Sequence, residues 1–167
     1  MKALFSILLS CLAFSVFSQN SSQYDNIPLT SAANYRKAEP QVILASDYVY
    51  SSPVDKENMN RKNAIAFIMK WMGGTSDYSF GMDETISKIA GGDNDILGMY
   101  FVCLAKYALD KGKGVDREEL KHNAYLLLAM YCENPDNNYK PKGEVKKLIE
   151  AKNQDKLKEF LDSKQKK

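Results

Sequence analysis

The chain has 167 residues, with a hydrophobic share of 44% and a charged share of 26%, values that are ordinary for one globular domain. A chain of this length can bury a core without disulfide bonds. The formal net charge of +2 is too small for the strongly basic composition of a typical nucleic-acid-binding protein.

Residues 1–18 have the pattern of a bacterial secretory signal peptide. Lys2 supplies a positive start, an apolar run follows over Ala3–Val16, and Val16 and Ser18 occupy the −3 and −1 positions of a cleavage site. The run is shorter than the ~20 residues that a membrane-spanning helix needs. A lipoprotein signal is the alternative, because Leu8-Leu9-Ser10-Cys11 offers a cysteine for lipid attachment. We favour cleavage after Ser18, which predicts a secreted or periplasmic protein without a transmembrane span.

The first part of the mature chain contains the stretch that is hardest to assign. Residues 19–30 are polar and predict a flexible N-terminus. A short helix is expected over Ser31–Glu39, before Pro40. Residues 41–52 carry β-type side chains, yet their spacing also suits a buried helix that begins at Pro40. We favour the helix. Asp55 and Glu57 then mark the start of a longer helix, which Gly73-Gly74 ends.

The rest of the chain predicts helices separated by clear end signals. A short helix is expected near residues 82–90, Asp93 caps one over 94–110, and Asp116 begins one that runs to about residue 133. Residues 124–132 are almost wholly apolar, which predicts that this helix is the centre of the core. Two more helices follow, one opened by Pro141 and one around Phe160. The fold class is therefore all-α: a single helical domain over 31–162, built as a compact multi-helix bundle or a short stack of helical hairpins, with six to seven helices.

The C-terminal residues concentrate positive charge. Lys140–Lys167 holds 10 lysines and 5 acidic residues, and it contains no arginine. One interpretation is a contact with an anionic surface or a nucleic acid. The other is a solvated helix face followed by a disordered Lys-rich tail over 163–167. We favour the second interpretation, because the acids are interspersed and because arginine is the usual residue for bidentate phosphate binding.

Two cysteines remain after the expected cleavage, and export invites a disulfide between them. Cys103 and Cys132 fall on successive predicted helices, about 10 and 17 residues from the turn that joins them. At a rise of about 1.5 Å per residue this places them roughly 10 Å apart along the axis, whereas a disulfide needs Cα atoms within about 7 Å. The prediction is therefore two buried free thiols.

Few residues suggest catalysis or metal binding. His122 is the only histidine, and it has neither a nucleophile motif for a triad nor the fourth ligand of a zinc site with Cys103 and Cys132. Four acids flank the short helix and resemble the carboxylate pairs of glycoside hydrolases: Asp83, Glu84, Asp93 and Asp95. Helix capping explains the same acids without chemistry. We predict no catalytic residue, no metal site and no cofactor.

The most unusual local feature is the segment Trp71–Phe80, in which aromatic side chains surround a glycine turn. Trp71, Tyr78 and Phe80 are the candidate binding residues, because aromatic and hydroxyl groups together suit sugar or peptide ligands. The alternative is a buried hinge in which the tryptophan docks into the core and the other two rings fasten the loop. The hinge is the favoured interpretation.

Three functions compete at this level. The favoured one is a non-enzymatic protein-interaction module, with an unknown protein partner in the cell envelope or extracellular space. The second is a small secreted hydrolase that acts on glycans, suggested by the paired acids and the aromatic loop. The third is a carrier of a small apolar ligand, suggested by the Tyr- and Met-rich helices. Nucleic acid is not expected as a partner of any of these.

Overall fold

A computed structural model describes residues 23–81 and 84–165 of the chain. Its helices are α1 (Ala32–Ser51), α2 (Met59–Met72), α3 (Glu84–Ala90), α4 (Asn94–Lys111), α5 (Arg117–Glu133), a 3-10 turn (Pro135–Asn137), α6 (Gly143–Asn153) and α7 (Leu157–Gln165). These two ranges contain no β-strand, so the all-α prediction is confirmed. None of the helices in them is both long enough and apolar enough to cross a bilayer.

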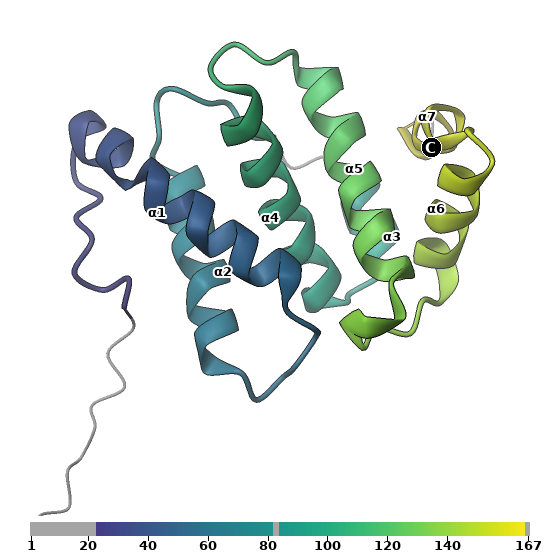
Figure 1. The fold of residues 1–167 in the computed structure, drawn as a ribbon. Coiled ribbons are helices and arrows are strands. Elements are labelled where there is room, and N and C mark those ends of the chain that lie inside the picture. The colour runs from purple at the N-terminus through teal and green to yellow at the C-terminus, as the bar shows by residue number, and fades with distance from the viewer. Residues whose placement is uncertain (1–22, 82–83, 166–167) are drawn as a thin grey trace, which may run out of the picture.

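The helices form a bundle with α4 at its centre. Figure 1 shows α1 and α2 at one end, α6 and α7 at the other, and α4 and α5 side by side between them. The helix α4 packs against α1, α2, α3 and α5. Although α3 follows α2 in sequence, it packs against α4, α6 and α7 instead. Because α3 crosses in this way, the arrangement is a bundle and not a stack of consecutive hairpins.

The prediction that the helix over residues 117–133 forms the centre of the core is wrong. Met130 on α5 is 48% exposed, and Leu126 and Leu127 are half-buried. On α4, by contrast, Tyr100 and Cys103 are wholly buried. An apolar run predicts that a helix packs well, but it does not reveal how many helices surround it.

Short polar side chains begin most of the long helices. The Asp93 carboxylate accepts hydrogen bonds from Asp95 N and Ile96 N, and Asp116 caps α5 in the same way, as the sequence predicts. The expected start of α2 is shifted. Asn58 caps α2, while Asp55 accepts a bond from the backbone of Glu57 and forms a turn before the helix.

Residues 41–52 are helical, as favoured, but the expected break at Pro40 is absent. One continuous helix, α1, runs through Pro40. A proline inside a helix removes the N–H that would bond to the carbonyl of Arg36. Pro40 is exposed, so water can reach that carbonyl, and buried residues on both sides of it, Ala38 and Val42, fix the helix to the core. Packing therefore outweighs the local cost of the proline.

Both ends of the described chain make contacts that the sequence does not predict. Within residues 23–30, the Tyr24 ring stacks on Phe67 at a centroid distance of 4.6 Å, and Leu29 is buried. At the other end α7 includes residues 163–165, because Ser163 bonds to the Phe160 carbonyl and Lys164 pairs with Glu144. The predicted leader over residues 1–18, residues 19–22 and Lys166–Lys167 lie outside the described residues.

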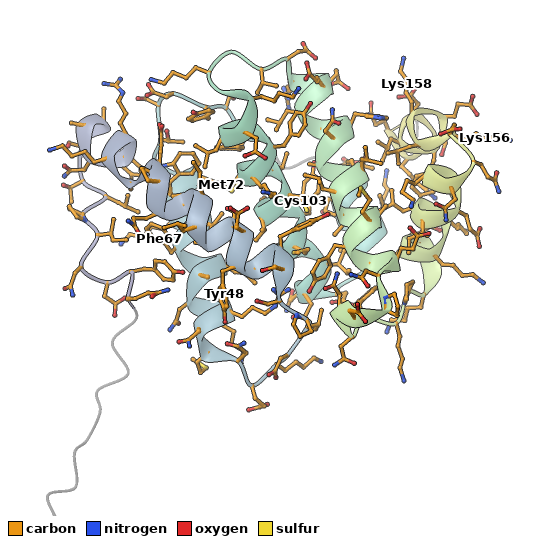
Figure 2. The ribbon with its side chains drawn as sticks, in the orientation of Figure 1. Tyr48, Phe67, Met72, Cys103, Lys156 and Lys158 are labelled. Atoms are coloured by element: carbon orange, nitrogen blue, oxygen red, sulfur yellow. The ribbon has the colours of Figure 1, made fainter. Side chains whose placement is uncertain are left out.

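The lysines of the C-terminal helices project outward, and several of them are paired. Figure 2 shows Lys156 and Lys158 pointing away from the bundle at the α7 end, while Cys103 lies in the interior. Lys152 pairs with Glu133 on α5. Lys147 pairs with Glu144 at 2.8 Å. The exposed Lys156 and Lys158 match the solvated helix face that the sequence predicts, whereas Lys152 is only partly exposed at its ion pair.

Candidate functional site

The three predicted aromatic residues come together at the end of α2. The Trp71 ring centroid lies 5.5 Å from that of Tyr78 and 5.8 Å from that of Phe80. Trp71 is fully buried, and its indole N–H donates to the Tyr35 carbonyl at 3.0 Å. Tyr78 and Phe80 are half-buried. Trp71 therefore has no surface to offer a ligand, and the geometry matches the hinge interpretation; only the outer faces of Tyr78 and Phe80 are accessible.

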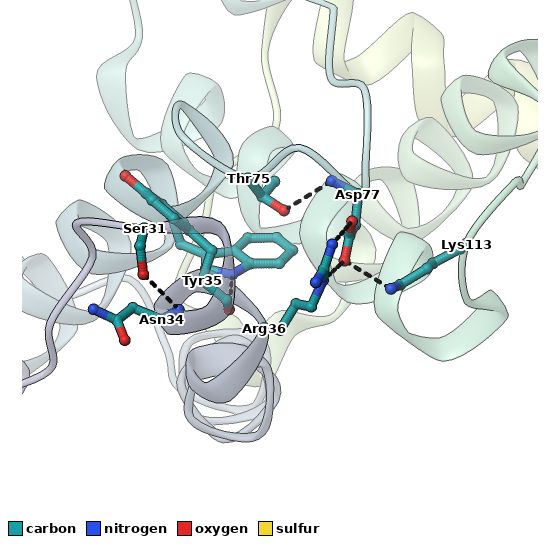
Figure 3. Close-up of polar contacts among 8 residues, drawn as sticks. Ser31, Asn34, Tyr35, Arg36, Thr75, Asp77 and Lys113 are labelled. Atoms are coloured by element: carbon teal, nitrogen blue, oxygen red, sulfur yellow. Dashed lines mark hydrogen bonds and ion pairs between the residues drawn. The ribbon is translucent and has the colours of Figure 1, made fainter.

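An ion-paired carboxylate fastens the same loop from outside (Figure 3). Asp77 accepts two hydrogen bonds from the Arg36 guanidinium, at 2.7 and 3.1 Å, and pairs with Lys113 at 2.7 Å. These hydrogen bonds hold the pKa of Asp77 well below its usual value. Because Arg36 lies on α1 and Lys113 lies between α4 and α5, one side chain connects three segments. Nothing in the local sequence signals this contact.

Among the predicted acids that the structure describes, Asp93 and Asp95 line one cavity, and Glu84 is not among its lining residues. Glu84, in the first turn of α3, is exposed and pairs with Lys88, whereas Asp93 lies beyond the other end of that helix. The Asp93 carboxylate is engaged in capping α4, and the Tyr139 hydroxyl donates to it at 3.5 Å. Asp83 lies outside the described residues.

The histidine and the cysteines lie in different surroundings. His122 is half-buried on α5 and lines a depression of ≈ 360 Å³ beside α7. Cys103 and Cys132 are buried and free, as predicted. Burial raises the pKa of Cys132 to about 12, so its thiol stays protonated at neutral pH. In the part of the chain that the structure describes, no group of three metal-ligating residues comes together.

The most distinctive cavity lies elsewhere, and we call it the charged cleft. Its volume is ≈ 560 Å³. Four segments build it: the α1–α2 loop, the first two turns of α2, the α3–α4 junction and the residue before α6. The lining consists of Asp55, Lys56, Arg61, Lys62, Ile65, Ala90, Gly91, Gly92, Asp93, Asn94, Asp95 and Lys142. Four of these side chains are cationic and three are anionic.

Arg61 is the buried member of the charged cleft. Its side chain is only 4% exposed. The guanidinium donates to the Val49 carbonyl at 2.7 Å and to the Tyr131 hydroxyl at 3.1 Å, and Tyr131 in turn donates to the Ser52 carbonyl at 2.7 Å. Val49 belongs to the last turn of α1, where the helix dipole is negative and favours a cation. No carboxylate pairs with Arg61 among the described residues.

Comparisons with known proteins return no match. Neither the protein-family models, nor the curated proteins, nor the solved structures include one that resembles this chain. Inferences about function therefore start from the geometry of the chain itself.

The seven charged side chains of the charged cleft are not paired with one another. Within residues 23–81 and 84–165, none of them takes part in an ion pair. Elsewhere in the structure, acids and bases pair between segments: Lys106 on α4 pairs with Asp47 on α1, and Lys113 pairs with Asp77 between two loops. The charges of the cleft are thus separated around a cavity, an arrangement suited to binding a ligand that carries charges of its own.

Arg61 is a residue of the cleft that was not predicted, although the sequence carries a signal for it. Arg61, Ala64, Ile68 and Trp71 recur at helical spacing and form the buried stripe of α2. An arginine in place of an apolar residue on such a stripe indicates a buried cation. The other members of the cleft come from segments far apart in the sequence, so only the fold brings them together.

Proposed function

We propose that this chain is an exported, non-enzymatic protein-interaction module, and that the charged cleft is where it recognises its partner. The observation that carries the proposal is the unpaired set of seven charges around one cavity, with the buried Arg61 at one side. Complementary charge gives an interface its specificity and its rate of association. A site built by four segments of a packed bundle is also held in place before the partner arrives.

The surroundings of the reactive side chains support binding in preference to catalysis. The Asp93 carboxylate already accepts bonds from the α4 backbone, and the thiol of Cys132 is held in its protonated form. His122 lies at a different depression, beside α7. The charged lining of the cleft also suits a charged segment of a protein better than an apolar ligand.

Site-specific photo-crosslinking tests the interaction. A benzoylphenylalanine is placed at Asn94, an exposed and uncharged residue that lines the charged cleft, or at Lys70, which is exposed and lies outside the cleft. The full chain is then irradiated in the cell envelope of the source organism. We expect one discrete crosslinked protein from position 94 and none from position 70. No product from position 94, or the same product from both positions, would refute the proposed site.

Export is supported by the leader pattern of residues 1–18, and it requires its own test. Mass spectrometry of the protein recovered from cell fractions should give a chain that begins at Gln19, found outside the cytoplasm. A chain that begins at a lipid-modified Cys11 would replace secretion by membrane anchoring. A full-length chain in the cytoplasm would contradict export.

A further inference from the structure

We propose that the charged cleft recognises a peptide segment in which a carboxylate and a lysine-type ammonium lie close together. The carboxylate is held by Arg61 and Lys62, and the ammonium is held by Asp95. This inference rests on the proposed function and adds to it the chemistry of the segment that is bound.

The cationic side of the cleft offers hydrogen-bond donors to a carboxylate. A guanidinium has five N–H donors, and the structure assigns protein acceptors to two Arg61 nitrogens, at Val49 and Tyr131. A buried cation without a carboxylate partner is costly, so an incoming carboxylate removes a cost that the folded protein already carries. Arginine binds carboxylates through two parallel hydrogen bonds. Lys62 and Lys142 line the same cavity and add positive charge.

The anionic side of the cleft centres on Asp95. Asp93 caps α4 through its own carboxylate, and it bonds to the backbone N–H of Asp95, so the Asp95 side chain is not used in the cap. Asp95 is half-buried and forms no ion pair in the described part of the chain. Asp95 and Arg61 line the same cavity, so one short ligand can reach both sides of the cleft.

The balance of charge argues for a ligand of mixed sign. A simple anion would suit the four cations but would be repelled by Asp55, Asp93 and Asp95. A simple cation would be repelled by Arg61 and the three lysines. A segment with both charges satisfies both sides. The volume of ≈ 560 Å³ lies within the range of about 300–1,000 Å³ that is usual for ligand pockets and has room for a short peptide.

A set of four blocked tetrapeptides tests the inference. Acetylated and amidated peptides with the central pairs Lys-Glu, Gln-Glu, Lys-Gln and Gln-Gln are titrated into the full mature chain labelled with ¹⁵N. We expect the Lys-Glu peptide to bind about tenfold or more tightly than either singly charged peptide. The largest amide shifts should fall at Arg61, Lys62 and Asp95. Equal binding of all four peptides, or no binding of any, would overturn the inference.

Two conservative substitutions assign the charges to their sides of the cleft. Asp95→Asn should remove the preference for Lys-Glu over Gln-Glu, and Lys62→Gln should reduce the preference for Lys-Glu over Lys-Gln. The matched controls Lys70→Gln and Asp162→Asn, exposed and outside the cleft, should leave both preferences unchanged. Arg61 is not substituted, because its bonds hold α1 and α5 together.

The outcomes separate this inference from the proposed function. Asp95→Asn with an unchanged preference for lysine would overturn the assignment of the ammonium. A discrete crosslinked partner from position 94 without any peptide preference would overturn the inference and leave the interaction module standing. Peptide preference without a crosslinked partner would support the charge assignment and count against a protein partner.

Discussion

Replacing Gly74 with alanine tests whether the loop after α2 needs a glycine for space. A Cβ at position 74 would lie 1.9 Å from the Oη atom of Tyr35 and 2.2 Å from its Cζ atom. Non-bonded heavy atoms prefer separations of about 3.5–4 Å, so the Tyr35 side chain must move. Gly73 is the matched control, because a Cβ there would meet only two backbone oxygens, at 3.5 and 3.7 Å.

The expected magnitude follows from the cost of overpacking, which is typically about 1–3 kcal/mol. In a domain of this size, 1 kcal/mol changes Tm by about 2–4 °C, so Gly74→Ala should lower Tm by about 2–12 °C. Gly73→Ala should leave Tm unchanged or raise it, because the φ of −71° at Gly73 suits alanine and because alanine restricts the unfolded chain.

Thermal denaturation followed by circular dichroism gives Tm. Trp71 donates to the backbone carbonyl of Tyr35, so a shift in the emission of this single tryptophan would show that the displacement extends from the Tyr35 side chain to its backbone. In a Tyr35→Ala background the added Cβ has room, and Gly74→Ala should then cost little. A wild-type Tm for Gly74→Ala, or an equal loss in both backgrounds, would refute the steric explanation.

Three further predictions concern other parts of the fold. Asp77→Asn should lower Tm more at pH 7 than at pH 3. The pKa of Asp77 is lower in the folded than in the unfolded chain. Its contribution to the free energy of unfolding is therefore full above about pH 4 and declines as the pH falls toward the pKa of the folded chain. Losses that are equal at both pH values would contradict this. Pro40→Ala should increase the free energy of unfolding by up to about 3 kcal/mol, because alanine restores a helix N–H. Urea denaturation should then show a higher midpoint; a lower midpoint would show that Pro40 does not destabilise α1. Cys103 and Cys132 should react with a thiol reagent only after unfolding, because both are buried; rapid labelling of the native protein would exclude that burial.

Local signals in the sequence predicted the ends of most helices. Asp93 and Asp116 cap α4 and α5, because the side chain of an aspartate just before a helix can reach the free N–H groups of the first turn. Two predictions failed where distant contacts decide the outcome. Pro40 does not break α1, because flanking residues are fixed in the core, and α5 leaves Met130 exposed because α4 has more helices around it.

The candidate sites show the same difference between features set by local sequence and features set by distant contacts. The cluster of Trp71, Tyr78 and Phe80 was predictable because one short segment, from the end of α2 into the following loop, contains all three residues. The carboxylate of Asp77 meets Arg36 and Lys113, which lie 41 and 36 residues away in the sequence, and the charged cleft draws on four separate segments. Charged residues on loops are so common that the sequence alone does not predict which of them come into contact. Arg61 was not predicted either, although its place on the apolar stripe of α2 was a signal of burial.

The way Arg61 is held has a practical consequence for finding what binds beside it. The carbonyl of Val49 and the hydroxyl of Tyr131 reach the guanidinium only when α1, α2 and α5 are assembled. A molecule that docks there binds the native form and has no equivalent site on the denatured chain. By mass action, each tenfold rise in its concentration above Kd adds about 1.4 kcal/mol to stability. Melting curves recorded over a library of compounds would therefore reveal occupants without any label, assay or prior guess.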